Sequence, residues 1–392
     1  MTAVTDTAPR PTLPTVRYGE ASLADLLPSV LASLGVGGEP NPLTLADTAR
    51  AVVLLVDGMG WELLKRHADA APFLTGLTGR PLTAGFPSTT VTSLTSLGTG
   101  LPPGEHGLTG YSSYVEEVGD AVNWLAWRPV GSGGDLRDRL PPEQVQPQPT
   151  AFERAADAGV TVTTATSAQF ADSGLTRAAL RGGRFAGSYA WGDSLALALD
   201  GVQRGNRSLV YCYLSELDLI GHVRGSETDA WLSQLQLVDG FARLLAEQLP
   251  PDAVLHVTAD HGMVVVPEEG RVDVDASGIL QDGVVALAGE PRMRHVHTRP
   301  GAARDVLAAW TAELGDRMWI GTRDDAVAAG LFGPEVTTTA RSRIGDVVAI
   351  ATTPDVAVVR RSAESMLSSL PGQHGALTDD ELLVPLLSTG AG

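Results

Sequence analysis

The residues of this chain with the clearest chemical potential are acids and histidines that follow short apolar runs. They are Asp57, Asp218, His222, Asp260, His261 and His374. Carboxylate and imidazole groups are ligands that suit zinc, and manganese is an alternative where oxygen ligands predominate. Six such ligands and a hydroxyl are enough for two metals that share one site. Two metals about 3.5–4 Å apart can hold the attacking and leaving oxygens of an in-line displacement.

A hydroxyl for such a site is available in the segment 86–100, which is crowded with Ser and Thr. Pro87 favours an extended entry, and an apolar stripe followed by glycines predicts a short helix that begins near Thr90. The stripe consists of Val91, Leu94 and Leu97. Free N–H groups and the dipole at a helix N-terminus stabilise an anionic phosphoryl group. Taken alone, the segment favours a capped loop without chemistry; the acids and histidines elsewhere shift the interpretation towards a nucleophile.

The candidate ligands differ in how strongly their local sequence patterns indicate metal binding. The pair Asp218 and His222 would share a helix face, but Gly221 between them favours a loop. The run Asp260–His261–Gly262 is the strongest single signal, because the glycine permits the sharp turn that lets both side chains reach one metal. His374 gains its weight only from the whole set. His106 is expected to fix its loop by hydrogen bonding.

The elements that must position these residues alternate as strands and helices. Short continuous apolar runs, typical of buried parallel strands, lie at 51–56, 160–165, 209–214 and 253–258. Helical patterns lie at 21–34, 61–74, 151–158, 188–201 and 226–249. We therefore expect an α/β fold with a mostly parallel central sheet flanked by helices. In such sheets ligands bind at the carboxyl edge of the strands, where the acids and histidines fall.

The chain is predicted to divide into three parts. Residues 1–49 form an N-terminal arm and a helix, with 1–20 as a loose arm. Residues 50–265 and 341–392 form the catalytic domain, and 266–340 a small inserted α+β cap subdomain. Strand-like runs at 346–351 and 356–359 are expected to return the chain to the core. A closing helix is expected over 378–387.

Composition narrows the function. The formal charge of −18 argues against a broad nucleic-acid-binding face, which would need many Lys and Arg residues, but it is compatible with a small phosphorylated substrate. No run of 18 apolar residues occurs, and the first 20 residues are polar and Pro-rich. We expect a cytoplasmic protein without a membrane segment. The single cysteine, Cys212, cannot form an internal disulfide and is expected in a buried strand.

The motifs together resemble the alkaline phosphatase superfamily, in its nucleotide pyrophosphatase/phosphodiesterase-like branch, over roughly residues 50–390. They are Val-Asp-Gly-Met at 56–59, Phe-Pro-Ser-Thr-Thr at 86–90, Asp-x-x-x-His at 218–222, Ala-Asp-His-Gly-Met at 259–263 and Gln-His-Gly at 373–375. The resemblance implies two zinc ions. Around one it places Asp57, Thr90, Asp260 and His261, and around the other Asp218, His222 and His374. Ser93 stands where nucleotide pyrophosphatases carry an asparagine that helps to hold the phosphate oxygen.

The expected activity is hydrolysis of a phosphodiester, with nucleotides among the candidate substrates, through a covalent phospho-threonine at Thr90. The Thr90 backbone N–H and Ser93 would bind the transferring oxygens. The alternatives are a phosphomonoesterase or phosphonate hydrolase, in which Arg128 or Arg177 could bind the extra charge, and a non-catalytic metal-binding homologue. A sulfatase is disfavoured because the nucleophile motif lacks Cys-x-Pro-x-Arg. The sequence does not indicate the oligomeric state.

Overall fold

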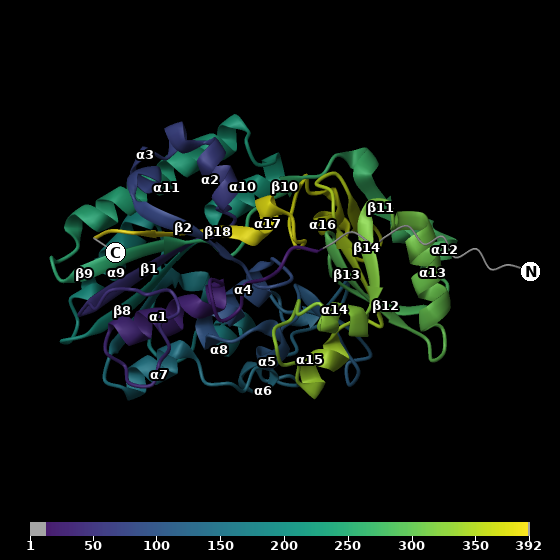
Figure 1. The fold of residues 1–392 in the computed structure, drawn as a ribbon, viewed down its shortest axis with the longest axis horizontal. Coiled ribbons are helices and arrows are strands. Elements are labelled where there is room, and N and C mark those ends of the chain that lie inside the picture. The colour runs from purple at the N-terminus through teal and green to yellow at the C-terminus, as the bar shows by residue number, and fades with distance from the viewer. Residues whose placement is uncertain (1–12, 391–392) are drawn as a thin grey trace, which may run out of the picture.

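The computed structural model describes residues 13–390, which build a central sheet, a second sheet and the helices around them (Figure 1). The central sheet has the strand order β2-β18-β9-β1-β8-β6-β7. Its strands are β1 (Arg50–Val56), β2 (Thr78–Thr83), β6 (Thr161–Ser167), β7 (Arg184–Ser188), β8 (Ser208–Leu214), β9 (Ala253–Thr258) and β18 (Leu383–Ser388). The strands β9, β1, β8, β6 and β7 run parallel. The predicted α/β class and mostly parallel sheet are confirmed.

Strand β1 lies at the centre of the sheet because its side chains are apolar on both faces. Every residue from Ala51 to Val56 is buried, as a strand covered by helices on both sides requires. Leu54 pairs with Cys212 of β8 on one side and with Val257 of β9 on the other. Cys212 is fully buried in its strand, as predicted.

The helices that accompany this sheet follow the predicted alternation with some breaks. They are α1 (Leu26–Ser33), α2 (Trp61–Arg66), α3 (Pro72–Gly76), α4 (Thr90–Thr99), α5 (Pro103–His106), α6 (Pro142–Val145), α7 (Ala151–Asp157), α8 (Gly174–Ala179), α9 (Trp191–Val202), α10 (Glu216–Arg224) and α11 (Asp229–Gln248). The single helix expected over 61–74 is split into α2 and α3, because Pro72 opens a new helix at a position where no N–H is needed. Within residues 13–390 no helix has the length and apolarity needed to cross a membrane.

The second sheet lies beside the central one and has the order β12-β13-β15-β14 (Figure 1). Its elements are β12 (Val284–Glu290), β13 (Met293–Thr298), β14 (Met318–Thr322), β15 (Val347–Ala351), α12 (Gly278–Gln281), α13 (Ala303–Leu314), α14 (Arg323–Ala328) and α15 (Thr338–Arg343). Smaller ladders join β10 (Val264–Val265) to β17 (Gly372–Gln373), β11 (Arg271–Asp273) to β16 (Ala357–Val359), and β3 (Ser112–Val115) through β4 (Asp120–Asn123) to β5 (Arg128–Pro129).

The two strand-like runs expected to return the chain to the core are buried strands that lie outside the central sheet. Strand β15 is paired on both sides within the second sheet, with β13 and β14, and β16 pairs with β11. A fully buried apolar run carries no signal of which sheet it joins, so the sequence predicts the strands but not their partners. The division of the chain at 266–340 stays a prediction.

The closing helix expected over 378–387 is also wrong. Helix α17 covers only Asp379–Leu382, and the chain continues as β18, antiparallel to both β2 and β9. Pro385 disfavours a helix there, because it has no N–H and its ring clashes with the preceding turn. In the strand Pro385 faces Pro81 of β2, and β18 pairs with β9 only from Leu386 onward, so the sheet tolerates it.

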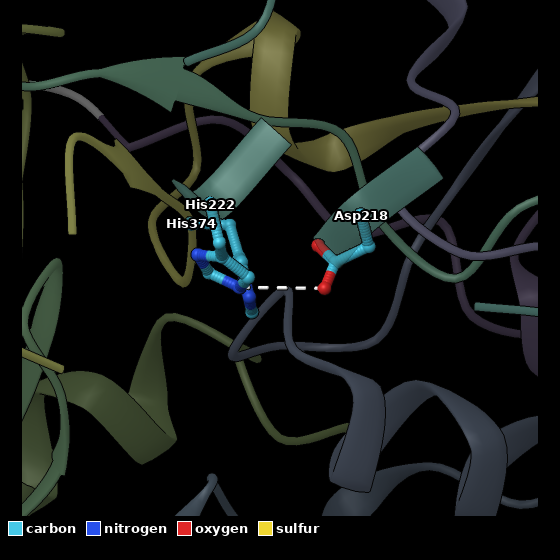
Figure 2. Close-up of side chains that lie close together, drawn as sticks. All are labelled: Asp218, His222 and His374. Atoms are coloured by element: carbon cyan, nitrogen blue, oxygen red, sulfur yellow. Dashed lines mark ion pairs between the residues drawn. The ribbon is translucent and has the colours of Figure 1, made fainter. Parts of the chain in front are cut away.

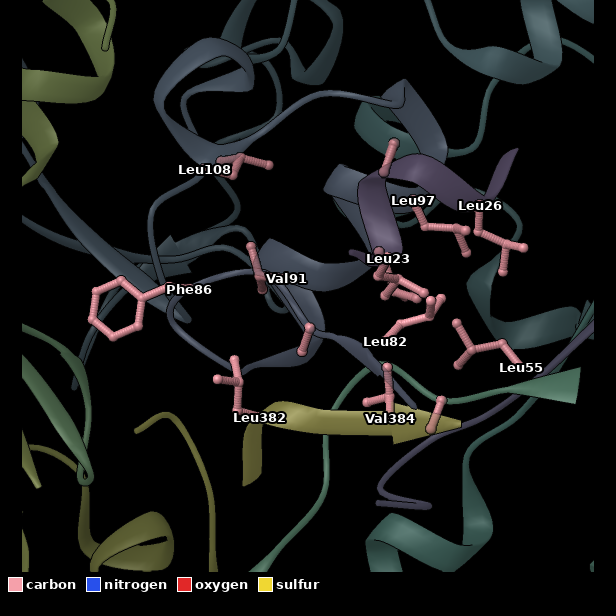
Figure 3. Packing of buried hydrophobic residues seen from close by; sticks show 14 of the residues in the cluster. Leu23, Leu26, Leu55, Leu82, Phe86, Val91, Leu97, Leu108, Leu382 and Val384 are labelled. Carbon is pink, nitrogen blue, oxygen red and sulfur yellow. The ribbon is translucent and has the colours of Figure 1, made fainter. Parts of the chain in front are cut away.

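The N-terminal segment packs against the body of the protein where it is described. Residues 1–12 of the predicted loose arm lie outside the described residues. In 13–20 the prediction is wrong: Val16 is buried, and the Tyr18 hydroxyl donates to Leu331 O (3.1 Å) and accepts from Phe86 N (3.0 Å). Leu23 and Leu26 follow and join the buried cluster around α4, which Figure 3 shows with Leu97 beside them.

Candidate active site

The sequence-predicted ligands converge at the carboxyl ends of β1, β8 and β9. Asp57 follows β1 directly, and its N–H donates to Leu214 O at the end of β8 (2.9 Å). Asp218 and His222 lie on α10, which begins two residues after β8. The pair Asp260–His261 follows β9, and His374 follows β17. The regular placement of polar residues after apolar strands therefore located this edge of the sheet correctly.

The first group surrounds His261. Its Nε2 atom lies 3.4 Å from Asp57 Oδ1, 3.6 Å from Asp260 Oδ2 and 3.2 Å from Thr90 Oγ1. Asp260 Oδ1 accepts hydrogen bonds from the N–H groups of Gly58 (3.2 Å) and His261 (3.0 Å), which fixes the carboxylate. All four side chains are buried. The structure thus brings together the four residues that the resemblance assigns to one metal.

The second group consists of Asp218, His222 and His374, whose candidate ligand atoms lie within 4.8 Å of one another (Figure 2). His222 Nε2 lies 3.4 Å from Asp218 Oδ2. Ligand atoms of Asp57, Asp218 and His261 also lie within 4.8 Å of one another, so Asp218 stands between the two groups. The rings of His261 and His374 are stacked with centroids 3.6 Å apart. The two groups therefore adjoin as one site.

Asp218 and His222 reach this geometry from a helix, and the expected loop is wrong. They are four residues apart on α10 and share a face. Glycine in a helix costs roughly 1 kcal/mol relative to alanine, but a Cβ at Gly221 would lie 2.5 Å from Met263 Sδ. Gly221 is thus required by close packing against the loop after β9, and it does not end the helix.

The three histidines present the same nitrogen to the site. The Nδ1 atoms of His222, His261 and His374 lie 2.8, 2.9 and 2.9 Å from the backbone oxygens of Gly372, Gly262 and Ser88, respectively. A carbonyl oxygen only accepts, so each Nδ1 carries a proton and donates. In the neutral ring Nε2 is left with its lone pair, which is the state that binds a metal.

The carboxylates have oxygens without hydrogen-bond partners. Within residues 13–390, Asp57 Oδ1, Asp218 Oδ1 and Asp260 Oδ2 are buried and accept no hydrogen bond. Burial raises the pKa of Asp57 well above its ordinary value, and the charges of Asp260 and Asp218 add to the effect. Burial also raises the pKa of Asp260. Buried carboxylate oxygens without hydrogen-bond partners destabilise the folded protein. Together with the neighbouring imidazole lone pairs they are suitable ligands for divalent cations, whose charge would offset theirs.

Thr90 is the first residue of α4, as predicted, and Gly100 ends that helix in a left-handed conformation (φ 74°). The stripe of Val91, Leu94 and Leu97 is buried, which fixes α4 in the core. Ser93, one turn after Thr90, is buried, and in the described part of the chain its hydroxyl has no partner. An anionic group placed at this N-terminus would meet free N–H groups and an available hydroxyl.

Sequence reasoning missed one residue of the site, Tyr213. Its hydroxyl donates to Asp57 Oδ2 and thereby leaves only Oδ1 of that carboxylate free. Tyr213 lies in β8, one position before the strand ends, and strand tyrosines are common enough that the sequence alone gave no signal. The expectation for His106 is confirmed, because it lies 3.0 Å from Ser96 Oγ and accepts from Leu108 N.

A cavity of about 310 Å³ opens beside Thr90. It is lined by Asp57, Thr90, Leu94, Leu125, Thr166, Phe170, Ser173, Leu175, Thr176, Leu180, Tyr211, Tyr213, Ser215, Asp218 and Leu219. No Lys or Arg of the described residues is in this lining. The two arginines considered for a monoester do not line it, and Arg177 forms an ion pair with Glu143 (2.8 Å).

Comparison with known proteins gives a consistent result. A sequence profile described as "Type I phosphodiesterase / nucleotide pyrophosphatase" matches residues 51–377. The fold is similar to murine ectonucleotide pyrophosphatase/phosphodiesterase 5, solved as an inactive threonine-to-alanine variant in complex with AMP (TM-score 0.66, 16% identity, 86% of this chain and 87% of that chain). It is also similar to the human protein of that name (TM-score 0.65, 17% identity, 87% and 88%). No curated protein sequence matches the chain.

Proposed function

This chain belongs to the type I phosphodiesterase/nucleotide pyrophosphatase family, and from that premise we propose that it hydrolyses phosphodiesters with Thr90 as the nucleophile. The observation that carries the proposal is the position of the Thr90 hydroxyl. It lies at the N-terminus of α4 and 3.2 Å from His261 Nε2, among three carboxylates with unpartnered oxygens. The inactive threonine-to-alanine variant of the murine protein supports a threonine in this role.

We propose two divalent metal ions as cofactors, zinc first and manganese as the alternative. The residues fit them, because three histidines and three carboxylates that each keep an oxygen without a hydrogen-bond partner adjoin in one site. Asp57, Asp260, His261 and Thr90 would hold one ion, and Asp218, His222 and His374 the other. When bound, such ions supply positive charge to the attacking and leaving oxygens.

Residues of the chain supply the nucleophile and the hydrogen-bond donors for a reaction in two steps. Thr90 Oγ1 forms a bond to phosphorus while the bond to the leaving oxygen breaks, and the leaving group departs as an alcohol with the Thr90 proton. Water then breaks the bond between Thr90 Oγ1 and phosphorus, releases a phosphomonoester and restores the hydroxyl. The N–H groups at the start of α4 and the Ser93 hydroxyl bind the non-bridging oxygens in both steps.

A diester is favoured over a monoester by the charge of the cavity. A monoester brings a second negative charge, which an arginine commonly binds with two hydrogen bonds. Neither Lys nor Arg from residues 13–390 lines the cavity beside Thr90. Nucleotides are candidate substrates because the murine relative is solved with AMP. A role as a non-catalytic metal-binding homologue is disfavoured by the complete ligand set.

The test compares bis-p-nitrophenyl phosphate, p-nitrophenyl phosphate and a dinucleotide, after chelation and after return of zinc or manganese. We expect hydrolysis of the diesters to depend on metal. Thr90→Ala should retain its metal while kcat falls by about 10⁴ or more, and Thr90→Ser should keep part of the activity. Thr92→Ala, on the same helix, is the matched control. Full activity in Thr90→Ala, or a phosphoryl label trapped on another hydroxyl, would refute the assignment.

A further inference from the structure

We propose that the cavity beside Thr90 binds an uncharged, apolar substituent of the phosphodiester, such as an aryl group or a short alkyl chain. The inference rests on the proposed function for the position of the phosphoryl group. Thr90, Asp57 and Asp218 form one wall of the cavity, so a substituent of a phosphoryl group at Thr90 enters it directly. The rest of the lining determines what that substituent can be.

Most of the cavity surface is apolar. Leu94 lies one helical turn after Thr90 on α4 and faces the same side. Further apolar lining comes from the segment between β6 and β7, with Phe170, Leu175 and Leu180. Phe170 packs edge to face on Tyr213, with ring centroids 5.9 Å apart. Burial of a substituent against these side chains is favourable in proportion to its apolar area.

Four polar side chains of the lining are paired with each other. Ser173 Oγ donates to Thr176 Oγ1 (2.9 Å) and accepts from Thr176 N (3.1 Å), and Tyr213 donates to Asp57. Among the described lining residues there is no Lys, Arg, His, Asn or Gln, the side chains that neutralise charge or pair with the edge of a base. A strongly polar substituent would lose its hydrogen bonds to water and gain few in return.

Two lining hydroxyls have no hydrogen-bond partner within residues 13–390, those of Tyr211 and Ser215. The Tyr211 hydroxyl is enclosed by protein, whereas Ser215 is half-buried at the start of α10. The Ser215 hydroxyl can satisfy a single polar atom of the substituent. The volume of about 310 Å³ is at the lower end of the range of ligand pockets, roughly 300–1,000 Å³. Size and polarity together favour one ring or a short chain with at most one polar atom.

Two exposed leucines mark the mouth of the cavity. Leu125, in the loop between β4 and β5, is 43% exposed, and Leu219 on α10 is 57% exposed. Single exposed leucines are ordinary on a protein surface. These two, however, come from separate elements and line the same cavity. They extend its apolar surface outward from Thr90, as a substituent longer than a methyl group would require.

The test uses the metal-loaded enzyme and diesters that share p-nitrophenolate as leaving group and differ in the other substituent. Methyl, butyl, hexyl, phenyl and thymidine-5′ esters form the series. We expect kcat/KM to rise by about fourfold per methylene until the cavity is full, and the phenyl ester to exceed the thymidine ester. Rates that do not depend on chain length, or a preference for thymidine over phenyl, would overturn the inference.

Binding separates this inference from the proposed function. The same series is titrated calorimetrically into metal-loaded Thr90→Ala. Affinity that rises with chain length, with no turnover of any ester by the wild type, would reject hydrolysis and retain the apolar cavity. Turnover of all esters with flat affinities would reject the cavity and retain hydrolysis.

A mouth variant and a matched control test the location. In Leu125→Gln the preference for hexyl over methyl should fall by about fivefold, because roughly half a leucine of apolar contact is lost. Leu237→Gln changes a leucine of similar exposure, 60%, on α11, away from the cavity. Its preference should match the wild type. Equal preferences in both variants would place the substituent elsewhere.

Discussion

Two sets of acids in this fold, which we call the paired set and the unpaired set, differ in their partners. Around the second sheet, Glu381 pairs with Arg292 (2.7 Å) and Glu364 with Arg294 (2.7 Å), and all four side chains are buried. At the edge of the central sheet, the buried Asp57 and Asp260 and the half-buried Asp218 have no arginine, and each keeps a buried oxygen without a partner in the described chain. An acid that is paired with an arginine has a structural role, because its charge is neutralised within the protein. An acid without such a partner is a candidate for binding a positively charged ligand.

An acid of the paired set, Glu381, also fixes loops that carry residues of the candidate site. Glu381 accepts hydrogen bonds from Ala376 N (3.0 Å) and Thr378 Oγ1 (2.6 Å), which fix the loop after His374. Its backbone oxygen accepts from Gly262 N (2.9 Å), next to His261. Arg292, on the turn between β12 and β13, therefore contacts a carboxylate that holds loops from both ligand groups. The second sheet thus contributes to the site through this ion pair.

The largest expected effect is on the paired set. Glu381→Gln keeps the shape of the side chain but leaves the Arg292 charge buried without its partner, which should lower the free energy of unfolding by about 3–5 kcal/mol. Urea unfolding of the metal-free protein measures it. A loss below about 1 kcal/mol would mean that water reaches this pair, and the contrast between the two sets would fail.

Glu290 shares features of both sets, because only one of its two carboxylate oxygens has a hydrogen-bond partner. Oε2 accepts from Tyr111 N (2.8 Å), whereas Oε1 has no partner within residues 13–390. Burial raises its pKa from the ordinary 4.5 to about 8. The stabilising contribution of a raised carboxyl pKa is complete below pH 4.5 and is lost as the pH rises to about 8. Unfolding free energy should therefore fall across that window, by at most about 1.4 kcal/mol per pH unit. Glu290→Gln should flatten the dependence; an unchanged slope would assign it to other groups.

The unpaired set should respond with the opposite sign. In Asp260→Asn the amide oxygen can keep the two backbone hydrogen bonds that Oδ1 accepts. The substitution also removes one of the three negative charges of the unpaired set, which lowers the repulsion on Asp57 and Asp218. After chelation, at about pH 8, the variant should be more stable than the wild type by about 1–3 kcal/mol. Elemental analysis should at the same time show a loss of bound metal. Destabilisation of the metal-free variant would show that Asp260 is a structural acid.

Features that depend on the local sequence pattern were predicted correctly, whereas features that depend on tertiary contacts were not. The strands before Asp57 and Asp260 and the start of α4 at Thr90 follow from apolar runs and capping residues, and the structure has them. The helix through Gly221 could not be predicted, because Met263 sets the need for glycine from far along the chain. The sheet membership of β15 and the bond from Tyr213 to Asp57 likewise depend on partners that no local pattern encodes.

The smallest effect is expected from an ion pair outside both sets. Arg299 lies 2.9 Å from Asp282, but the side chains are 63% and 85% exposed. Water screens both charges before and after substitution, so Arg299→Gln should change the unfolding free energy by less than about 1 kcal/mol. The amide leaves Asp282 solvated, whereas Glu381→Gln leaves Arg292 in the interior. Urea unfolding of the two variants in one buffer compares them directly. Similar losses in both would show that burial does not set the cost of breaking a pair in this protein, and the unpartnered acids beside Thr90 would lose their value as a sign of function.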